Sequence, residues 1–418
     1  PPSPPPSPAM FHYIAVCISR TRPPKMIDSV PQTTRGFRSN WFGGMCTPEE
    51  RGTPQPLGSF QQIVNRIKYP VTHMVMWQAS SYAAKLGFQQ KFVTLPSGET
   101  MGFLEKPATP SSGGAVSSTL VYLHGMNMNP TGLLFNSGKH LNLPEGVRCL
   151  VPELLGHGSR IAHTKASGKA ETGFSLDEYA MDVDGFLDAV GIAPDAKIHL
   201  MGYSLGGATA LRLAELTHSR RLGRVALAGP SVAIGFGVSE ELRAGLIKYA
   251  YSTGPEAVAF LKLVGADDPT ADRVGPVMAT MRAIAHGDEG TTTITEYWSA
   301  LWAGLARSDE PDAFIPTKPA DLDSIPEALP ILRGAKALAR ANVPTLIVQG
   351  GSDQVCDVSG ALAVRQAFGE TGLCEYIEIP GCGHYFDPSK PNGLFLKSAN
   401  RAAAAFFHQE EERGMERV

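Results

Sequence analysis

The sequence is poor in several features that mark large classes of protein. Only six cysteines occur in 418 residues, and no two of them form a C-x-x-C pair. This spacing argues against a zinc site or a disulfide framework, and it favours free thiols in a reducing, intracellular compartment. The formal net charge is only −3, which gives no electrostatic basis for binding nucleic acid.

Long apolar runs are also missing. No stretch reaches the roughly 18 to 20 apolar residues that a transmembrane helix needs. The nearest is 69–88, YPVTHMVMWQASSYAAKLGF, which polar residues interrupt. Two interpretations of it stay open: an interfacial helix that contacts a membrane peripherally, or a helix that packs on the domain.

Residues 1–68 lack the composition of a folded core. They open with PPSPPPSP, and 9–45 is rich in Arg and Lys with a single acid, Asp28. This bias is typical of a disordered tail or of a segment that targets a protein to an organelle.

From residue 89 onward, short apolar runs alternate with helical patterns. A hairpin is expected over 90–105, with Ser97 and Gly98 in its turn. Further strands are expected at 119–124, 147–151, 197–202, 224–229, 344–350 and 375–380. The apolar spacing of 176–190 predicts a helix, and Ser175 with Glu178 predicts a capping box at its start. Apolar strands separated by helices predict a mostly parallel, doubly wound sheet covered on both faces.

One region interrupts this alternation. Residues 231–341 show several helical patterns and no convincing strand, which predicts a helical cap inserted between the two core segments 89–230 and 342–410. Trp298, Trp302 and Met278 of this cap are candidates for an apolar acyl pocket; the alternative is that they pack the cap internally.

The stretch GYSLG, residues 202–206, lies where an expected strand meets an expected helix. A serine there can cap a helix, but Gly202 and Gly206 on either side of Ser204 indicate a tight turn that presents a nucleophile. A serine hydroxyl needs a base to become reactive. Asp353 and His384 each follow an expected parallel strand, so the sheet brings them to the same edge as Ser204, where they would act as acid and base.

The same edge also offers hydrogen-bond donors for a developing oxyanion. Gly125 follows the strand 119–124 and allows a sharp turn, so that the backbone N–H of Met126 can point into the site. The N–H of Leu205, at the start of the next helix, would be the second donor. The histidines show no metal-ligand spacing, and the sequence predicts neither a metal nor a cofactor.

Taken together, HGM at 124–126, LLGHGS at 154–159, GYSLGG, GSDQV and GCGH resemble the α/β-hydrolase superfamily over about 89–410. Within it, VPTLIVQGGSDQVCDVSGA at 343–361 and WQASSYAAKLGFQQKFV at 77–93 are similar to the membrane-associated monoacylglycerol lipases. This resemblance implies an α/β-hydrolase fold and a serine hydrolase of lipid esters, with Ser204, Asp353 and His384 as its triad.

The expected function is therefore cleavage of carboxylic esters, such as monoacylglycerols or other small lipophilic esters, through an acyl-serine intermediate. Two alternatives stay open: a hydrolase of carbon–carbon bonds with the same fold, or a non-catalytic receptor for a small ligand. The sequence does not fix the oligomeric state, the compartment or the acyl chain length.

The composition of 1–68 leads to a testable expectation. A chain beginning at Tyr69 should keep the catalytic constants of the full chain on a water-soluble ester, because a proline-rich tail adds nothing to the reacting groups. Steady-state kinetics on both chains would check this. A folded but inactive shortened protein would show that 1–68 contribute to the site.

Overall fold

A computed structural model describes the chain over 70–109, 118–126, 128–135, 137–160, 167–169, 173–217, 222–230, 234–236, 315–317, 322–387 and 394–415. The predicted N-terminal segment 1–68 lies outside these residues. So does most of the predicted cap, including Trp298, Trp302 and Met278.

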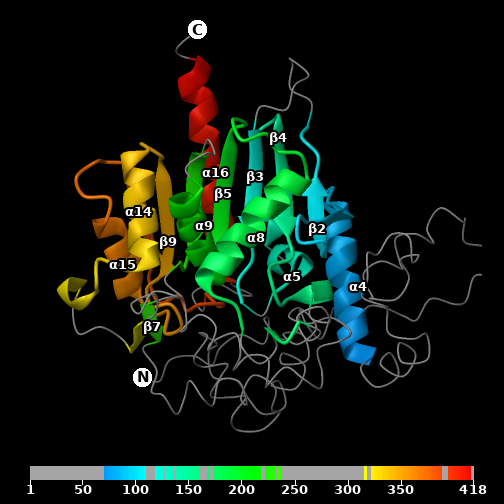
Figure 1. The fold of residues 1–418 in the computed structure, drawn as a ribbon, viewed down its shortest axis with the longest axis horizontal. Coiled ribbons are helices and arrows are strands. Elements are labelled where there is room, and N and C mark those ends of the chain that lie inside the picture. The colour runs from blue at the N-terminus through cyan, green and yellow to red at the C-terminus, as the bar shows by residue number, and fades with distance from the viewer. Residues whose placement is uncertain are drawn as a thin grey trace, which may run out of the picture.

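An eight-stranded sheet forms the centre of the fold (Figure 1). Its strands are β1 (Gln89–Thr94), β2 (Thr100–Lys106), β3 (Ser118–Leu123), β4 (Val147–Pro152), β5 (Ile198–Tyr203), β6 (Leu222–Ala228), β9 (Thr345–Gly350) and β10 (Cys374–Ile379). Their spatial order is β1-β2-β4-β3-β5-β6-β9-β10. The predicted hairpin β1–β2 and the β2–β4 pair are antiparallel, and every other neighbouring pair is parallel. All the strands expected from the sequence are thus confirmed, and so is the mostly parallel sheet.

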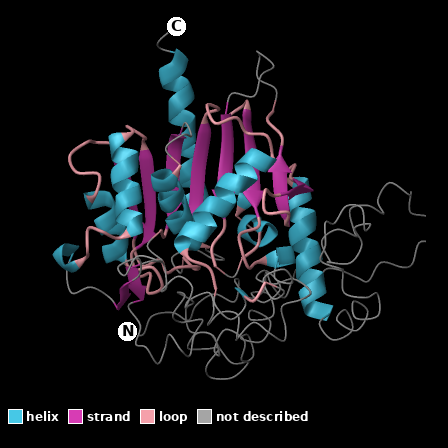
Figure 2. Cartoon of the chain, viewed as in Figure 1, coloured by secondary structure: helices cyan, strands magenta, loops and turns pink. Residues whose placement is uncertain are grey.

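Helices cover both faces of this sheet (Figure 2). One hydrophobic cluster contains buried residues of α8 (Leu176–Ala189), α9 (Leu205–Leu216), α14 (Pro330–Arg340) and α15 (Val358–Gln366). A second cluster contains those of α4 (Pro70–Lys85), α5 (Pro130–Leu134) and α16 (Phe395–Met415). Strand β3 feeds both clusters, because successive side chains of a strand point to opposite faces. Its Val121 and Leu123 belong to the first cluster, and its Leu120 and Tyr122 to the second.

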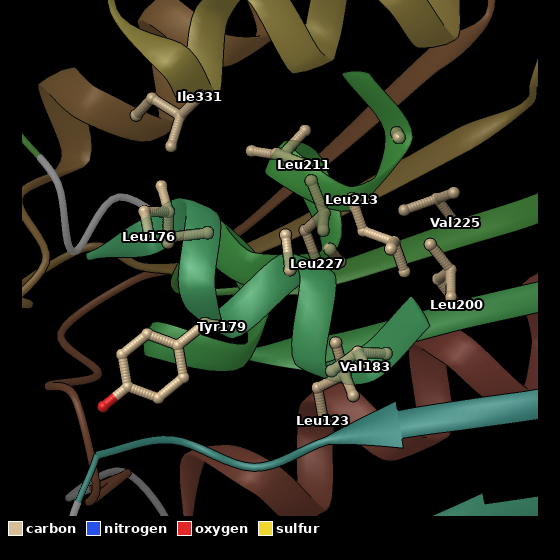
Figure 3. Close-up of a cluster of buried hydrophobic side chains, with 14 of the residues drawn as sticks. Leu123, Leu176, Tyr179, Val183, Leu200, Leu211, Leu213, Val225, Leu227 and Ile331 are labelled. Carbon is tan, nitrogen blue, oxygen red and sulfur yellow. The ribbon is translucent and has the colours of Figure 1, made fainter. Parts of the chain in front are cut away.

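Helix α8 shows how the apolar pattern becomes packing. Its Leu176, Tyr179 and Val183 are fully or almost fully buried and lie in the same cluster as the leucines of α9 and β5 (Figure 3). The predicted capping box is confirmed: the Ser175 hydroxyl accepts from the Glu178 N–H, and the Glu178 carboxylate accepts from the Ser175 N–H.

The range predicted as a helical cap differs from expectation at both ends. Two short strands, β7 (Ile234–Phe236) and β8 (Ile315–Thr317), pair in parallel inside it. Helix α14 also falls inside it, yet this helix packs on α9 so closely that a Cβ at Gly334 would meet the backbone of Leu211. The apolar stripe of α14 was compatible with a cap helix, because periodicity identifies the buried face of a helix but not the surface that covers it. The core therefore resumes before 342.

Helix α4 lies in the segment 69–88, for which the sequence allowed either an interfacial helix at a membrane or a helix packed on the domain. Ala79, Ser80 and Ala83 are buried, and the Tyr82 ring meets Phe135 edge-on at a centroid distance of 6.0 Å. The C-terminal half of the helix therefore packs on the domain, while Trp77 is 47% exposed. Over the described part of the chain, no helix combines the length and the apolar character needed to cross a bilayer.

A buried ionic cluster ties the hairpin to α8. Arg160, at the end of the 3₁₀ helix η3 (Gly158–Arg160), donates to the carboxylates of Glu99 and Asp182 at distances of 2.5 to 2.9 Å. The Arg160 side chain is fully buried. Burial raises the pKa of Asp182, although the positive charge of Arg160 opposes that rise. The positive charge of the Arg160 guanidinium thus offsets the negative charges of the Glu99 and Asp182 carboxylates.

Replacing Arg160 by methionine should lower the free energy of unfolding by about 3–5 kcal/mol, because it leaves two buried carboxylates without their cation. Lys336→Met, which breaks only the exposed contact with Glu327, should leave the unfolding midpoint almost unchanged. Urea denaturation at pH 8 and pH 5 would measure both. Without Arg160 the folded-state pKa of Asp182 rises further, so the folded chain holds the extra proton and the loss should be smaller at pH 5. A loss below that of Lys336→Met would contradict this account.

Candidate active site

The turn between β5 and α9 holds Ser204 in a strained backbone conformation. Its φ is 54° and its ψ is −119°, a region that residues with a side chain rarely adopt. A Cβ at Gly202 would strike the carbonyl of Gly206, and one at Gly206 would strike the carbonyl oxygen of Leu123. Both glycines are therefore required by close backbone contacts, as the tight turn predicted from the sequence demands.

His384 reaches Ser204 from the loop that follows β10. Its Nε2 lies 3.1 Å from the Ser204 Oγ, and the exposed fractions of the two residues are 1% and 4%. The loop is fixed in part by Cys382, whose Sγ lies 3.2 Å from the carbonyl oxygen of Phe386. Cys382 thus makes a local contact within this loop, two residues from the histidine.

Asp353, in the loop after β9, holds the other side of the imidazole. Its Oδ2 lies 2.7 Å from the Nδ1 of His384, and its Oδ1 accepts from the N–H groups of Val355 and Cys356 at 2.8 Å each. A carboxylate oxygen only accepts, so the hydrogen sits on Nδ1 of the neutral ring. The Nε2 is then the acceptor that faces the Ser204 hydroxyl.

The turn after β3 lies directly against the nucleophile turn. A Cβ at Gly125 would come within 2.9 Å of the Tyr203 ring and 3.2 Å of the Ser204 Cβ. Gly125 has no left-handed φ, so the need for glycine comes from this close approach rather than from the sharp turn that the sequence suggested. Met126 follows it and is buried. Leu205 is the first residue of α9, where an N–H has no acceptor within the helix.

Two further histidines lie beside this turn without joining the site. The Nδ1 of His124 donates to the Gly125 carbonyl at 2.8 Å, and its Nε2 accepts from the Leu154 N–H at 3.0 Å. Burial holds the pKa of His124 well below its usual range and that of His157 at about 4. Both rings are neutral near pH 7, and His124 anchors the turn that carries Met126.

Three residues near the reacting groups were not singled out in the sequence. Tyr203 donates its hydroxyl to the carbonyl of His384, and the Cys356 Sγ lies 3.8 Å from the Ser204 Oγ. The Nε2 of Gln349 donates to the Cys356 carbonyl at 2.8 Å and lies 3.4 Å from Asp353. Each is a near neighbour in sequence of a triad candidate, and that adjacency is the only signal that the sequence offers.

The described residues contain no group of three or more His, Cys, Asp or Glu that could hold a metal. Four of the cysteines lie in this part of the chain, and all four are free thiols: Cys149, Cys356, Cys374 and Cys382. The remaining two, Cys17 and Cys46, fall outside the described residues.

Comparison with curated proteins gives a short match. The chain is 36% identical over 124 residues to the dihydrolipoyllysine-residue acetyltransferase component of the acetoin cleaving system of Pseudomonas putida. The match covers 29% of this chain and only 30% of that protein. The chain therefore matches less than a third of that protein's length.

Solved structures share the fold at low sequence identity. A bacterial membrane phospholipase A has a TM-score of 0.55 and 17% identity, over 85% of this chain and 96% of its own. A meta-cleavage product hydrolase of Pseudomonas fluorescens and a haloalkane dehalogenase of Bradyrhizobium elkani each have a TM-score of 0.50 and 18% identity, over 78% of this chain and 99% of their own. These enzymes differ in their named reactions, so the likeness establishes architecture alone.

The family comparison extends across the core. Residues 120–396, well over half of the chain, match the alpha/beta hydrolase family. The matched range contains the nucleophile turn, the loops of Asp353 and His384, and all the parallel strands from β3 to β10 except the first two residues of β3. With its eight-stranded sheet and helices on both faces, the chain belongs to the alpha/beta hydrolase family.

Proposed function

We propose that this protein is a serine hydrolase that cleaves carboxylic esters through an acyl-Ser204 intermediate. The observation that carries the proposal is the continuous contact from Asp353 to His384 to Ser204, with heavy-atom distances of 2.7 and 3.1 Å. Each group is positioned for one role: Ser204 as nucleophile, His384 as base, and Asp353 as the carboxylate that orients the base.

Acylation begins with attack of the Ser204 Oγ on the ester carbonyl carbon while the hydroxyl proton passes to the His384 Nε2. The resulting imidazolium is stabilised by Asp353, which already accepts from Nδ1. When the tetrahedral intermediate collapses, the bond to the leaving oxygen breaks. His384 returns the proton to that oxygen, so the alcohol leaves neutral and the acyl group stays on Ser204.

The backbone N–H groups of Met126 and Leu205 are the proposed donors to the oxyanion. Support comes from the contact between the two turns, because a Cβ at Gly206 would meet the carbonyl oxygens of both Leu123 and His124. Each such donor typically contributes on the order of 3 kcal/mol to lowering the barrier.

Deacylation repeats these steps with water. His384 takes a proton from a water molecule as its oxygen attacks the acyl carbon, and it then returns that proton to Ser204. The products are the carboxylic acid and the free enzyme, so no proton or electron is left unaccounted for.

The proposed substrates are lipophilic esters such as monoacylglycerols. Support comes from the similarity of 343–361 to the membrane-associated monoacylglycerol lipases and from the fold shared with a membrane phospholipase A. Helix α4 is the proposed site of peripheral membrane contact, because its Trp77 is 47% exposed while Ala79, Ser80 and Ala83, which follow it, are buried. Aromatic side chains of this kind favour the membrane interface.

Labelling by a fluorophosphonate probe, followed by hydrolysis rates on nitrophenyl esters of increasing chain length and then on monoacylglycerols, tests the proposal. We expect labelling at Ser204 and a specificity constant that rises with chain length. Labelling without turnover of any ester, combined with cleavage of a carbon–carbon bond in a vinylogous diketone acid, would favour the carbon–carbon hydrolase. Absence of labelling in the folded protein would favour a receptor.

A further inference from the structure

Tyr203 connects three parts of the candidate site through one buried side chain. It is the last residue of β5, directly before Ser204, and it is completely buried. Its hydroxyl donates to the backbone carbonyl of His384 at 2.9 Å, although 181 positions separate the two residues in sequence. This hydrogen bond therefore joins the nucleophile turn to the backbone of His384, the proposed base.

The Tyr203 ring also contacts the imidazole itself. The two rings are stacked, with an interplanar angle of 25° and a centroid distance of 5.1 Å. Asp353 holds the Nδ1 of His384, Tyr203 covers one face of its ring, and the Tyr203 hydroxyl donates to its backbone carbonyl. The Tyr385 ring also meets the imidazole edge-on, at a centroid distance of 5.1 Å. Tyr203 is the residue that restrains both the ring and the backbone of the base.

One edge of the Tyr203 ring lies against the turn that carries the first proposed oxyanion donor. A Cβ at Gly125 would come within 3.0 Å of both the Cδ1 and the Cε1 of Tyr203. One rigid aromatic ring therefore sets the spacing between the loop of the base and the turn of Met126, with Ser204 between them.

The Tyr203 hydroxyl is not itself a proton donor in the reaction. Its hydrogen is directed at a backbone carbonyl, and burial raises the pKa of Tyr203 well above its ordinary value. The group stays protonated throughout the working range of pH, so it serves as a permanent hydrogen-bond donor.

We infer that Tyr203 is a positioning residue that aligns the His384 imidazole with Ser204, an inference that rests on the proposed function. Proton transfer from Ser204 depends on the distance between Nε2 and Oγ, and a displacement of about 1 Å can cost on the order of 10²-fold in rate. Tyr203 contributes by holding the base in register, without touching the substrate.

Tyr203→Phe tests this inference, because it keeps the stacked ring and removes only the hydroxyl. We expect kcat on a soluble ester and the rate of fluorophosphonate labelling to fall by about 10- to 100-fold, with KM changed less than about twofold. The low-field proton resonance of the His384–Asp353 hydrogen bond should weaken or shift, since a less restrained imidazole exchanges its proton faster.

Tyr122→Phe is the matched control. Tyr122 is also fully buried, and its hydroxyl donates to the Asn400 side chain at 2.8 Å rather than to a residue of the triad. It should lower the urea midpoint about as much as Tyr203→Phe does, while kcat and the resonance stay at wild-type values. If the two variants have equal kcat, or if the resonance is unchanged in Tyr203→Phe, the inference is wrong.

Ser204→Ala, assayed in parallel, separates this inference from the proposed function. A wild-type protein that hydrolyses no ester and takes no probe, like the Ser204→Ala variant, would overturn the proposed function itself. An active wild type, an inactive Ser204→Ala and a fully active Tyr203→Phe would overturn only the role of Tyr203.

If Tyr203→Phe fails to fold, Tyr203→Trp, which keeps an aromatic ring and a donor N–H, should recover labelling above the level of Tyr203→Leu. Equal labelling of these two would count against positioning.

Discussion

Replacing Ser204 by alanine should abolish both ester hydrolysis and fluorophosphonate labelling while the protein remains folded. We expect kcat to fall by about 10⁴- to 10⁶-fold, because without the nucleophile the base His384 has no hydroxyl proton to accept. His384 and Asp353 would keep their mutual contact of 2.7 Å, but no atom would be left to accept the acyl group. Only the residual effect of binding and of the oxyanion donors would remain.

Two variants provide the controls for this result. Ser137→Ala removes a buried hydroxyl that donates to the Leu133 carbonyl and not to a residue of the triad, and it should leave kcat unchanged. Ser204→Gly should be as inactive as Ser204→Ala but more stable than it by about 1 kcal/mol, because glycine adopts a φ of 54° with little strain. Retention of more than about a thousandth of wild-type turnover by purified Ser204→Ala would falsify the assignment of the nucleophile.

The sequence specified the sheet and the relative places of the triad candidates well, for identifiable reasons. Apolar strands such as β5 and β9 are buried along their whole length, so their composition alone predicts that they lie inside the sheet and not at its edge. Parallel strands deliver their C-terminal loops to one edge, which brings Ser204, Asp353 and His384 together although up to 180 positions separate them. Topology thus converts order along the chain into proximity.

Contacts that depend on side-chain packing could not be predicted in this way. The close approach of the Tyr203 ring to Gly125, and the stack of that ring on His384, depend on rotamers and on the tilt of neighbouring loops. Helix α14 illustrates the same limit at a larger scale, since its apolar stripe did not reveal that α9 was its partner. Periodicity gives the buried face, whereas the partner of that face is a property of the whole fold.

The second large effect is expected at Asp353. Asp353→Asn should lower kcat by about 10⁴-fold, because the same substitution in the triad of serine proteases stabilises the wrong tautomer of the histidine. The Asp353 Oδ1 accepts hydrogen bonds from the N–H groups of Val355 and Cys356, and in the variant the amide oxygen of asparagine would accept them instead. The amide nitrogen would then face His384 and donate to Nδ1. The ring would carry its hydrogen on Nε2, pointing at Ser204, where it could no longer accept the hydroxyl proton.

Asp357 is the matched control, because it is an aspartate four positions further on and is also buried. Its Oδ1 accepts from the N–H and the hydroxyl of Ser359, which makes it the N-cap of α15 rather than a partner of the histidine. Asparagine caps helices about as well as aspartate, so Asp357→Asn should leave kcat within about twofold of wild type and cost little stability. Steady-state kinetics on the two variants therefore measure the role of the carboxylate rather than the cost of removing a buried charge from this loop. A silent Asp353→Asn beside a damaging Asp357→Asn would move the acid to Asp357, and it would require the loop to rearrange so that this cap turns toward His384.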